Sequence, residues 1–508
     1  MKQNGIRILA LILAGIMSLS AFSCGKEETP SQPSPMKTEQ TQTEGKNEQA
    51  GQDKPTEKTG DEESLSAENP APSEPAETEW SEPDYSDFVM PEDTGKLYLY
   101  VDSSMGKSIM NPAIERFKEL YPDVEVTYEI VDEDAFDTRL QTELPAGSGP
   151  DVVFFLANSI PDVSKTMATG LFIDLGPYFE TDAEIDPGDF VDGVMRCGMY
   201  QGRRYFVPLC FNAPILVARR SMLDELGIDD PSDFDSLTEA ARRYHEAYPD
   251  SSLFMDSSSI ETWITNLRYL VRFSGMRFID YERGLTECDE ERLREIMDLM
   301  KIYYDPNYVE YDTNKADRLN GDYMRVDCLL KNECLFNDFD NYYYAFSRVK
   351  KALAKAGDEA VAFVPRDMKG NITAEYVQSA SIPQGAKNKL NAWRLIKILL
   401  SDEIQSARDE SRLGNSIFWS GKPVRISALR KDFEYEVGFW GLDIEDPEEQ
   451  KLLDEFVELW SSPTNAQRLP DTVSRYINLE LMPYVKGEKS WNDCYKRFMN
   501  TLELYASE

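Results

Sequence analysis

The stretch that decides the fold is GPDVVFFL, residues 149–156. The five residues after Asp151 are all apolar, which is typical of a short strand buried on both faces of a sheet. A turn-forming run of Pro, Gly and Ser begins at Pro145, so this strand follows a chain reversal.

Two strands and two helices are predicted before this segment. Residues 97–101 are a second continuous apolar run, and residues 124–130 alternate apolar with polar side chains. The helices are predicted over 110–120, from apolar residues spaced by three or four, and over 135–144. This alternation predicts an α/β protein with a parallel sheet and right-handed crossovers. Ligands of such sheets bind beyond the carboxyl ends of the strands, here at residues 102–104 and 157–159.

Helical periodicity dominates the rest of the chain. Helices are expected over residues 233–248, 260–273, 290–304, 391–401, 452–460 and 491–504. Short strands are expected over residues 205–207, 253–255, 361–364 and 375–379.

The first 24 residues have the pattern of an export signal. Lys2 and Arg7 precede an apolar run, and small residues lead to Cys24. The run is shorter than a membrane span needs. We expect a signal peptide over residues 1–23 and lipidation at Cys24, the alternative being ordinary cleavage near Ala21 that leaves a free thiol.

Residues 24–93 are predicted to be a disordered acidic tether. Residues 25–93 carry 19 acidic and 5 basic side chains and few apolar ones, so they cannot bury enough surface to offset the entropy of ordering. The net charge of the whole chain is −38, and most of it lies beyond the tether. Such a field repels nucleic acid and disfavours anionic ligands, although a local basic pocket could override it.

Six cysteines follow Cys24, and buried reduced thiols are favoured over disulfides, whose pairing the sequence leaves open. No two cysteines have CxxC spacing, which argues against a thiol-redox centre or a zinc ribbon, and we predict no metal and no cofactor. The six are Cys197, Cys210, Cys288, Cys328, Cys334 and Cys494.

Five segments, in this order, resemble the extracellular solute-binding proteins that serve ABC sugar importers. They are GPDVV at 149–153, GLFIDL at 170–175, residues 200–212, MLDELG at 222–227 and residues 386–403. The resemblance implies the two-lobed periplasmic-binding-protein fold of type II, with a ligand cleft between lobes that close about a hinge. It implies a solute-binding domain over residues 94–508, with one lobe at about 95–211 and 342–380. The other lobe takes about 213–338 and much of 381–508.

The resemblance also implies where ligand contacts lie. It places Ser103, Ser104, Asn158 and Asn212 on loops of the first lobe, and Asp256, Ser258 and Trp263 on the second lobe. Tyr342 matches a stacking aromatic position. Because amides, carboxylates and aromatic faces are what sugars need, we add Asp338, Asp340 and Trp419 as candidates. Packing is the alternative for Trp263 and for the tyrosines near residue 342, and turn formation for the neighbouring Asn and Asp residues.

The function expected is that of a lipid-anchored receptor, a monomer on the extracytoplasmic face of the membrane. It would deliver a carbohydrate or oligosaccharide to an ABC permease. An enzyme is not expected, because the only histidine, His245, belongs to no recognisable catalytic set. The alternatives are a glycan-acting surface enzyme, a sensor or adhesive lipoprotein of the same fold, and a receptor for polyamines or other cations.

Overall fold

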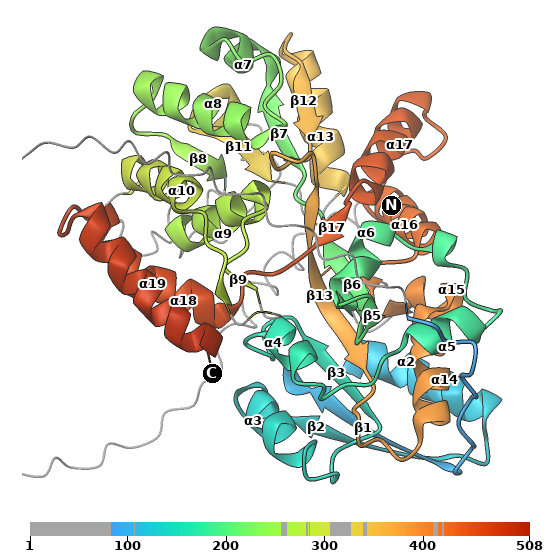
Figure 1. Cartoon of the computed structure of the whole chain (residues 1–508). Helices are drawn as coiled ribbons and strands as arrows, with labels where there is room; N and C mark the ends of the chain where they lie inside the picture. The colour runs from blue at the N-terminus through green and yellow to red at the C-terminus, as the bar shows by residue number, and fades with distance from the viewer. Residues whose placement is uncertain are drawn as a thin grey trace, which may run out of the picture. The chain divides into compact units, whose positions relative to one another are not determined.

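The computed structural model describes residues 83–507 apart from 106, 256–261, 281–282, 284, 305–326, 339–342, 410–414 and 419–420. Within this part, helices pack on two main β-sheets, one with seven strands and one with four (Figure 1). The predicted signal, the lipidation site Cys24 and most of the tether lie outside the described residues.

The seven-stranded sheet contains the first half of the chain and a later return segment. Its order is β16-β6-β13-β3-β1-β2, and β17 pairs with β13. The strands are β1 (Lys96–Asp102), β2 (Glu125–Val131), β3 (Val152–Leu156), β6 (Val207–Asn212), β13 (Thr373–Ser381), β16 (Lys422–Pro423) and β17 (Asn465–Ala466).

The predicted alternation of strands and helices is confirmed. Helices α2 (Lys107–Leu120) and α3 (Glu133–Glu143) connect β1, β2 and β3, and β1 pairs in parallel with both other strands. All of β3 is buried because it lies between β1 and β13, which explains its unbroken apolar sequence. Strand β2 lies at the edge of the sheet, and its alternating sequence leaves Tyr128 and Ile130 exposed.

Asp151 joins two of the segments that carried the family resemblance. Its carboxylate accepts hydrogen bonds from the backbone N–H groups of Tyr98, Lys387 and Asn388, each 2.9 Å long. Asp151 is 4% exposed, and a buried carboxylate needs such partners. The Gly-Pro-Asp motif therefore ties β1 to the start of α14 (Lys389–Leu400).

The second sheet has the order β12-β7-β11-β8. Strand β7 is antiparallel to β11 and β12, so its amino end lies beside their carboxyl ends. The strands are β7 (Leu216–Arg219), β8 (Ser252–Met255), β11 (Cys334–Asp338) and β12 (Ala360–Phe363). A core distinct from that of the first sheet packs around it, together with α7 (Arg220–Leu226), α8 (Phe234–Ala247), α9 (Thr262–Ser274), α10 (Glu290–Ile302), α18 (Asp471–Val485) and α19 (Trp491–Ser507).

The chain crosses between the two sheets at three connections. They run from β6 to β7, from β12 to β13, and from β17 to α18. The connection from β6 to β7 agrees with the lobe boundary expected at about residues 211–213, around Asn212. A crossover near residues 338–341 was also expected, but β11 continues through α13 (Tyr343–Lys355) to β12, which pairs with β7 of the same sheet.

The predicted lobe boundaries therefore need correction. Residues 360–363 pair in the second sheet, and the return to the first sheet begins at Thr373. Helix α14 packs on α2 and β1 of the first sheet, and β16 pairs with β6. Strand pairing places these segments, and the sequence pattern carried no information on which sheet each strand joins.

Local sequence explains where the helices begin and end. The Asp233 carboxylate accepts the backbone N–H of Ser236 at 2.9 Å and caps α8. Asp446 caps α17 (Pro447–Ser461), which has Pro447 in its first turn, and α2 ends before Pro122. Further helices in the described part of the chain include α4 (Val163–Ala168), α5 (Gly176–Thr181), α6 (Asp192–Met195), α15 (Asp402–Gln405) and α16 (Ile426–Phe439).

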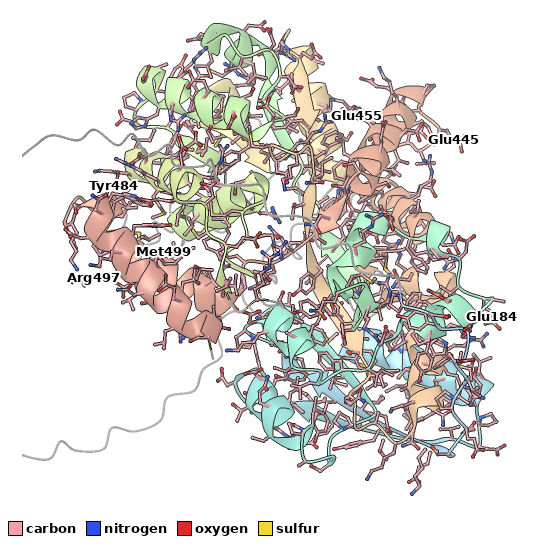
Figure 2. All side chains as sticks on the ribbon, viewed as in Figure 1. Glu184, Glu445, Glu455, Tyr484, Arg497 and Met499 are labelled. Carbon is pink, nitrogen blue, oxygen red and sulfur yellow. The ribbon has the colours of Figure 1, made fainter. Side chains whose placement is uncertain are left out.

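Aromatic and polar contacts fasten the last two helices together. Tyr484 of α18, labelled in Figure 2, has its ring centroid 5.3 Å from that of Trp491 of α19. The Tyr484 hydroxyl donates to Asp298 of α10. Trp491 donates its indole N–H to Glu290 at 3.0 Å. These contacts hold α18 and α19 on the helical layer of the second sheet.

All six cysteines beyond Cys24 are free thiols in the structure. This agrees with the prediction of reduced thiols rather than disulfides. Burial raises the pKa of Cys288 to about 12. None of the helices in the described ranges combines the length and the apolar character required to cross a bilayer.

Candidate ligand site between the two sheets

Strands β1, β3 and β6 of the first sheet all end at the same edge. β1 and β3 are parallel, and β6 runs in the same direction because both β3 and β6 are antiparallel to β13. The loops after Asp102, Leu156 and Asn212 therefore meet at one edge, where an open α/β sheet binds its ligands.

Glu133 connects two of the predicted site residues at this edge. Its backbone N–H donates to the hydroxyl of Ser103 at 3.2 Å, and its carboxylate accepts the side-chain amide of Asn158 at 2.6 Å. The structure thus brings together loops that follow β1, β2 and β3. Glu133 was not among the predicted site residues. Its position just after the alternating strand at residues 124–130 indicates the same edge of the sheet.

Asn212 lies at the end of β6, directly opposite Glu375 on β13. Asn212 is partly exposed. Glu375 pairs with Arg468 at 2.8 Å and with Arg272 at 3.4 Å. The predicted residue Asn212 therefore borders a cluster of charges that the sequence analysis did not identify.

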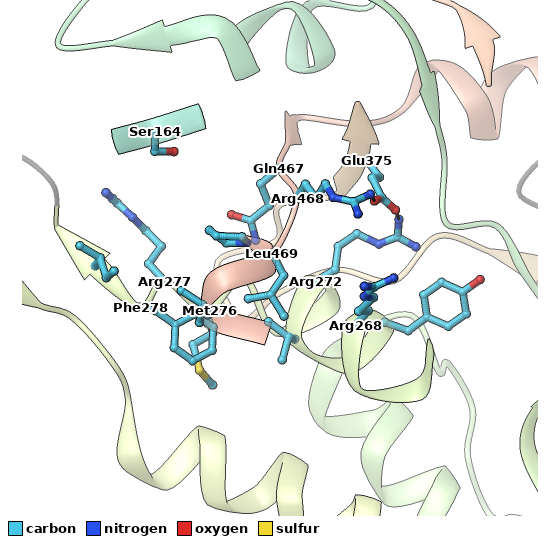
Figure 3. Close-up of a pocket in the computed structure, with 15 residues that line it drawn as sticks. Ser164, Arg268, Arg272, Met276, Arg277, Phe278, Glu375, Gln467, Arg468 and Leu469 are labelled. Carbon is cyan, nitrogen blue, oxygen red and sulfur yellow. Dashed lines mark hydrogen bonds and ion pairs between the residues drawn. The ribbon is translucent and has the colours of Figure 1, made fainter. Parts of the chain in front are cut away.

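This cluster lines a cavity of about 290 Å³. Figure 3 shows its walls: Ser164 comes from α4, Glu375 from β13, Arg268 and Arg272 from α9, and Arg468 from the connection between β17 and α18. Elements of both lobes thus contribute, and one of the three connections between the sheets, that from β17 to α18, lines the cavity.

The charged groups in the cavity are interlocked. Arg468 also pairs with Asp471 at 3.4 Å, and Arg268 lies 3.9 Å from the same carboxylate. Burial acts to lower the pKa of Arg468, but the negative charges of Glu375 and Asp471 outweigh it, so this pKa is raised. Arg468 stays charged at any physiological pH.

The sequence spacing of the arginines could have predicted part of this cluster. Arg268 and Arg272 are four residues apart in a predicted helix, so they lie on one face. Arg468 directly precedes Leu469 and Pro470, which lead into another helix. No sequence pattern, however, indicated that these two segments meet.

Many of the predicted site residues have no described side chain. Ser104 lies in the short helix Ser103–Met105, Trp263 in α9 and Asp338 at the end of β11, but the positions of their side chains are not described. Asp256, Ser258, Asp340, Tyr342 and Trp419 lie outside the described residues. The assignment of all these residues to the ligand site stays a prediction.

The tyrosines that follow β11 pack against other side chains where they are described, Tyr343 in the interior and Tyr344 at the surface. Tyr343 is buried, and its hydroxyl donates to the Glu449 carboxylate at 2.6 Å. Tyr344 stacks on Trp440 with ring centroids 4.6 Å apart. Among the described residues, packing therefore accounts for both side chains.

Comparison with known proteins shows a likeness to one family. A sequence profile described as "Bacterial extracellular solute-binding protein" matches residues 102–316, which is less than half of the chain. Over these residues the chain is similar to that family. The family is one of extracellular solute-binding proteins, and the two-lobed α/β fold with a cleft between the lobes is the fold of its solved members.

Solved structures of sugar-binding proteins have the same fold. The sugar-binding protein MalE of Xanthomonas citri superposes with a TM-score of 0.54 at 14% identity, over 81% of this chain and 97% of that one. The cyclic alpha-maltosyl-1,6-maltose binding protein of Arthrobacter globiformis gives 0.50 at 15% identity, over 81% and 99%. At such identities the likeness shows the fold of this chain and nothing further.

A curated relative matches over a shorter stretch. It is YcjN of Escherichia coli strain K12, which is named as an ABC transporter periplasmic-binding protein. It is 24% identical over 142 residues, which are 28% of this chain. The match spans about a third, 32%, of the relative's own length.

Proposed function

We propose that this protein is the extracytoplasmic receptor of an ABC importer and that it binds a carbohydrate or oligosaccharide without turning it over. One observation carries this proposal. Side chains that suit sugar hydroxyls, namely Ser103, Asn158 and Asn212, follow the strand ends at the same sheet edge as Glu375, which lines the cavity. The sugar-binding proteins of the same fold support the choice of ligand class.

Hinge closure is the proposed mechanism. The connection from β6 to β7 is short and buried, since Ala213 and Ile215 are inaccessible to solvent. A ligand that contacts both lobes favours the closed state by the difference between its affinities for the two states.

The ligand residues proposed on the second lobe complete the site. Asp256, Ser258 and Trp263 follow β8, while Asp338, Asp340 and Tyr342 lie at or after the end of β11. Strand β11 ends beside the first residue of β7, close to the connection from Asn212, and β8 ends beside β11 because the two strands are parallel. Ser104 and Trp419 are proposed to add contacts from loops of the first lobe.

A thermal-shift screen over neutral and charged saccharides, polyamines and amino acids tests the ligand class. A ligand that binds the folded state stabilises it by about 2.7 kcal/mol at a hundredfold excess over Kd. We expect a shift with one sugar class and recovery of that sugar unaltered. A shift with polyamines alone would overturn the carbohydrate assignment, and a shortened sugar would support a glycan-acting enzyme.

We propose that a lipid on Cys24 holds the receptor at the membrane, where the closed monomer docks on the permease. Metabolic labelling with a palmitate analogue tests the anchor, since a Cys24→Ala variant should lose both label and membrane association. Co-purification with permease subunits in the presence of sugar separates a transport receptor from a sensor or adhesive lipoprotein. Neither nucleic acid nor a cofactor has a place in this proposal.

A further inference from the structure

The cavity between the sheets has a charge opposite to that of the chain. The chain has a net charge of −38, yet four arginines and one carboxylate, Glu375, line this cavity. Two more carboxylates lie just outside the lining: Asp471, beside Arg268 and Arg468, and Glu287, which is 3.4 Å from Arg277. Even with all three carboxylates counted, the arginines are in excess.

Arg272 is the most buried of these cations. Its side chain is only 9% exposed, and its guanidinium lies 5.1 Å from the ring centroid of Tyr269 and 5.5 Å from that of Phe273. A guanidinium carries five N–H donors, and the one described partner of Arg272 is Glu375, on Nη1. Its buried Nε has no hydrogen-bond partner in the described structure.

Burying the Arg272 guanidinium is energetically unfavourable unless a further hydrogen-bond acceptor binds its free N–H donors. Burying an unpaired donor of a charged group costs free energy that the protein must recover elsewhere. The aromatic rings and Glu375 hold the Arg272 guanidinium at the wall of the cavity, with donors unused. A pre-positioned, partly desolvated guanidinium is the group best suited to bind an oxyanion with two parallel hydrogen bonds.

Arg268 and Arg468 extend this donor surface. Arg268 lies one helical turn before Arg272, its side chain is 48% exposed, and 3.9 Å separates it from Asp471, its one partner among the described residues. Arg468 approaches from the opposite wall, where it shares Glu375 with Arg272 (Figure 3). Glu375 thus holds two guanidinium groups together without using up their donors.

The remaining walls suit a small saccharide. Tyr269 and Phe278 supply aromatic rings, and Ser164 and Gln467 supply neutral hydrogen-bonding groups. The volume of about 290 Å³ lies at the lower end of the range for ligand pockets, about 300–1,000 Å³. This size favours a short ligand over a long polysaccharide chain.

We infer that the carbohydrate bound by this protein carries an oxyanion, a carboxylate, sulfate or phosphate, that Arg268, Arg272 and Arg468 bind in the cavity between the two sheets. The inference rests on the proposed function and refines its ligand class. The acidic surface excludes most anions by long-range repulsion, so local guanidinium contacts select the ligand.

Calorimetric titration of the exported chain (from residue 25) with matched sugars tests the inference. The probes are hexuronates, sulfated hexoses and hexose phosphates, each compared with the neutral hexose, and inorganic phosphate. We expect one acidic class to bind at least tenfold more tightly than its neutral parent, with affinity that falls as salt rises. The class that binds identifies the oxyanion.

Variants separate this site from a general charge effect. Arg272→Met keeps the bulk of the side chain, and we expect it to weaken acidic-sugar binding by about 10- to 100-fold. Arg268→Gln changes a more exposed residue and tests the site if Arg272→Met fails to fold. Arg294→Gln, on the exposed face of α10, is the control and should bind normally.

The outcomes distinguish failure of the oxyanion inference from failure of the carbohydrate assignment. Equal or tighter binding of the neutral sugar, unchanged in Arg268→Gln, would overturn the oxyanion inference and leave the carbohydrate receptor intact. Binding of inorganic phosphate but of no sugar would support an oxyanion site and overturn the carbohydrate assignment. Binding of neither sugar nor phosphate would overturn both.

Discussion

The phenol of Tyr505, in the last helix, donates a hydrogen bond of 3.1 Å to the carboxylate of Asp162, which caps α4. Lys165 of α4 completes the contact, since its ammonium lies 4.4 Å from the centroid of the Tyr505 ring. Burial, the charge of Asp162 and this hydrogen bond raise the pKa of Tyr505. Because α19 packs with the second sheet and α4 with the first, this contact joins the two lobes.

Tyr505→Phe tests the role of this contact in hinge closure. The variant removes one hydrogen bond to a charged group, and we expect ligand affinity to fall about 3- to 30-fold because the closed state loses a stabilising contact. Titration calorimetry measures the affinity, and X-ray scattering measures whether the ligand-bound protein is less compact. Tyr495→Phe, on the same helix and without a described hydrogen bond, is the control; an equal loss in both variants would contradict this role.

Lys422 is predicted to be the most sensitive charged residue of the first lobe. It is buried against Asp432 at 2.6 Å and Glu436 at 2.5 Å, and Arg408 also contacts Asp432. Lys422→Ala leaves the Glu436 carboxylate buried without its cation and Asp432 with Arg408 alone, so the free energy of unfolding should fall by about 3–5 kcal/mol. Urea denaturation measures it. Lys431→Ala breaks an exposed pair with Asp402 and should cost less than about 1 kcal/mol.

Asp93 makes the fold sensitive to acid. Hydrogen bonds from the backbone N–H of Gly95 and from Asn391, together with Arg394, lower the pKa of Asp93 to about 2. Because the folded-state pKa lies below the unfolded value of about 3.9, the stabilisation is complete above pH 4 and is lost as pH falls toward 2. In the Asp93→Asn variant, the free energy of unfolding should depend less on pH between about pH 4 and pH 2. Urea denaturation at several pH values measures this dependence. The same flattening in Asp123→Asn, an exposed site, would refute the assignment.

Gly198 lies where no side chain fits. A Cβ at this position would lie 1.9 Å from the carbonyl oxygen of Phe206, a backbone atom. Gly198→Ala should therefore lower the free energy of unfolding by about 1–3 kcal/mol or prevent folding. Gly438 in α16 has nothing within 4 Å of such a Cβ, so Gly438→Ala should stabilise the protein by about 0.5–1 kcal/mol. Thermal unfolding of both variants makes the comparison.

Much of the fold followed from local patterns. The buried run before Leu156 and the helices over residues 110–120 and 233–248 were predicted because the spacing of apolar residues reports which face of an element is buried. The assignment of residues 360–363 to the first lobe was wrong, because these residues form β12, which pairs with β7. Strand partnership depends on contacts between distant segments, which one sequence does not encode in its periodicity.

Some residues of the candidate site could also be predicted from local sequence, and others could not. The position of Asn158 at the sheet edge could be predicted because the end of a buried strand is recognisable from the strand itself, and that of Asn212 followed from the family resemblance. Their role as ligand contacts stays a prediction. The arginine cluster could not be predicted, since Arg272, Glu375 and Arg468 come from three elements that meet only where the lobes face each other.

The sequence by itself determined the acidic character, the α/β class and the loops at the sheet edge, because these depend on composition and on short-range spacing. Tertiary structure alone decided that a basic cavity forms inside an acidic protein. A charge acts on its spatial neighbours within a few ångströms, and folding, rather than order along the chain, determines which residues are neighbours.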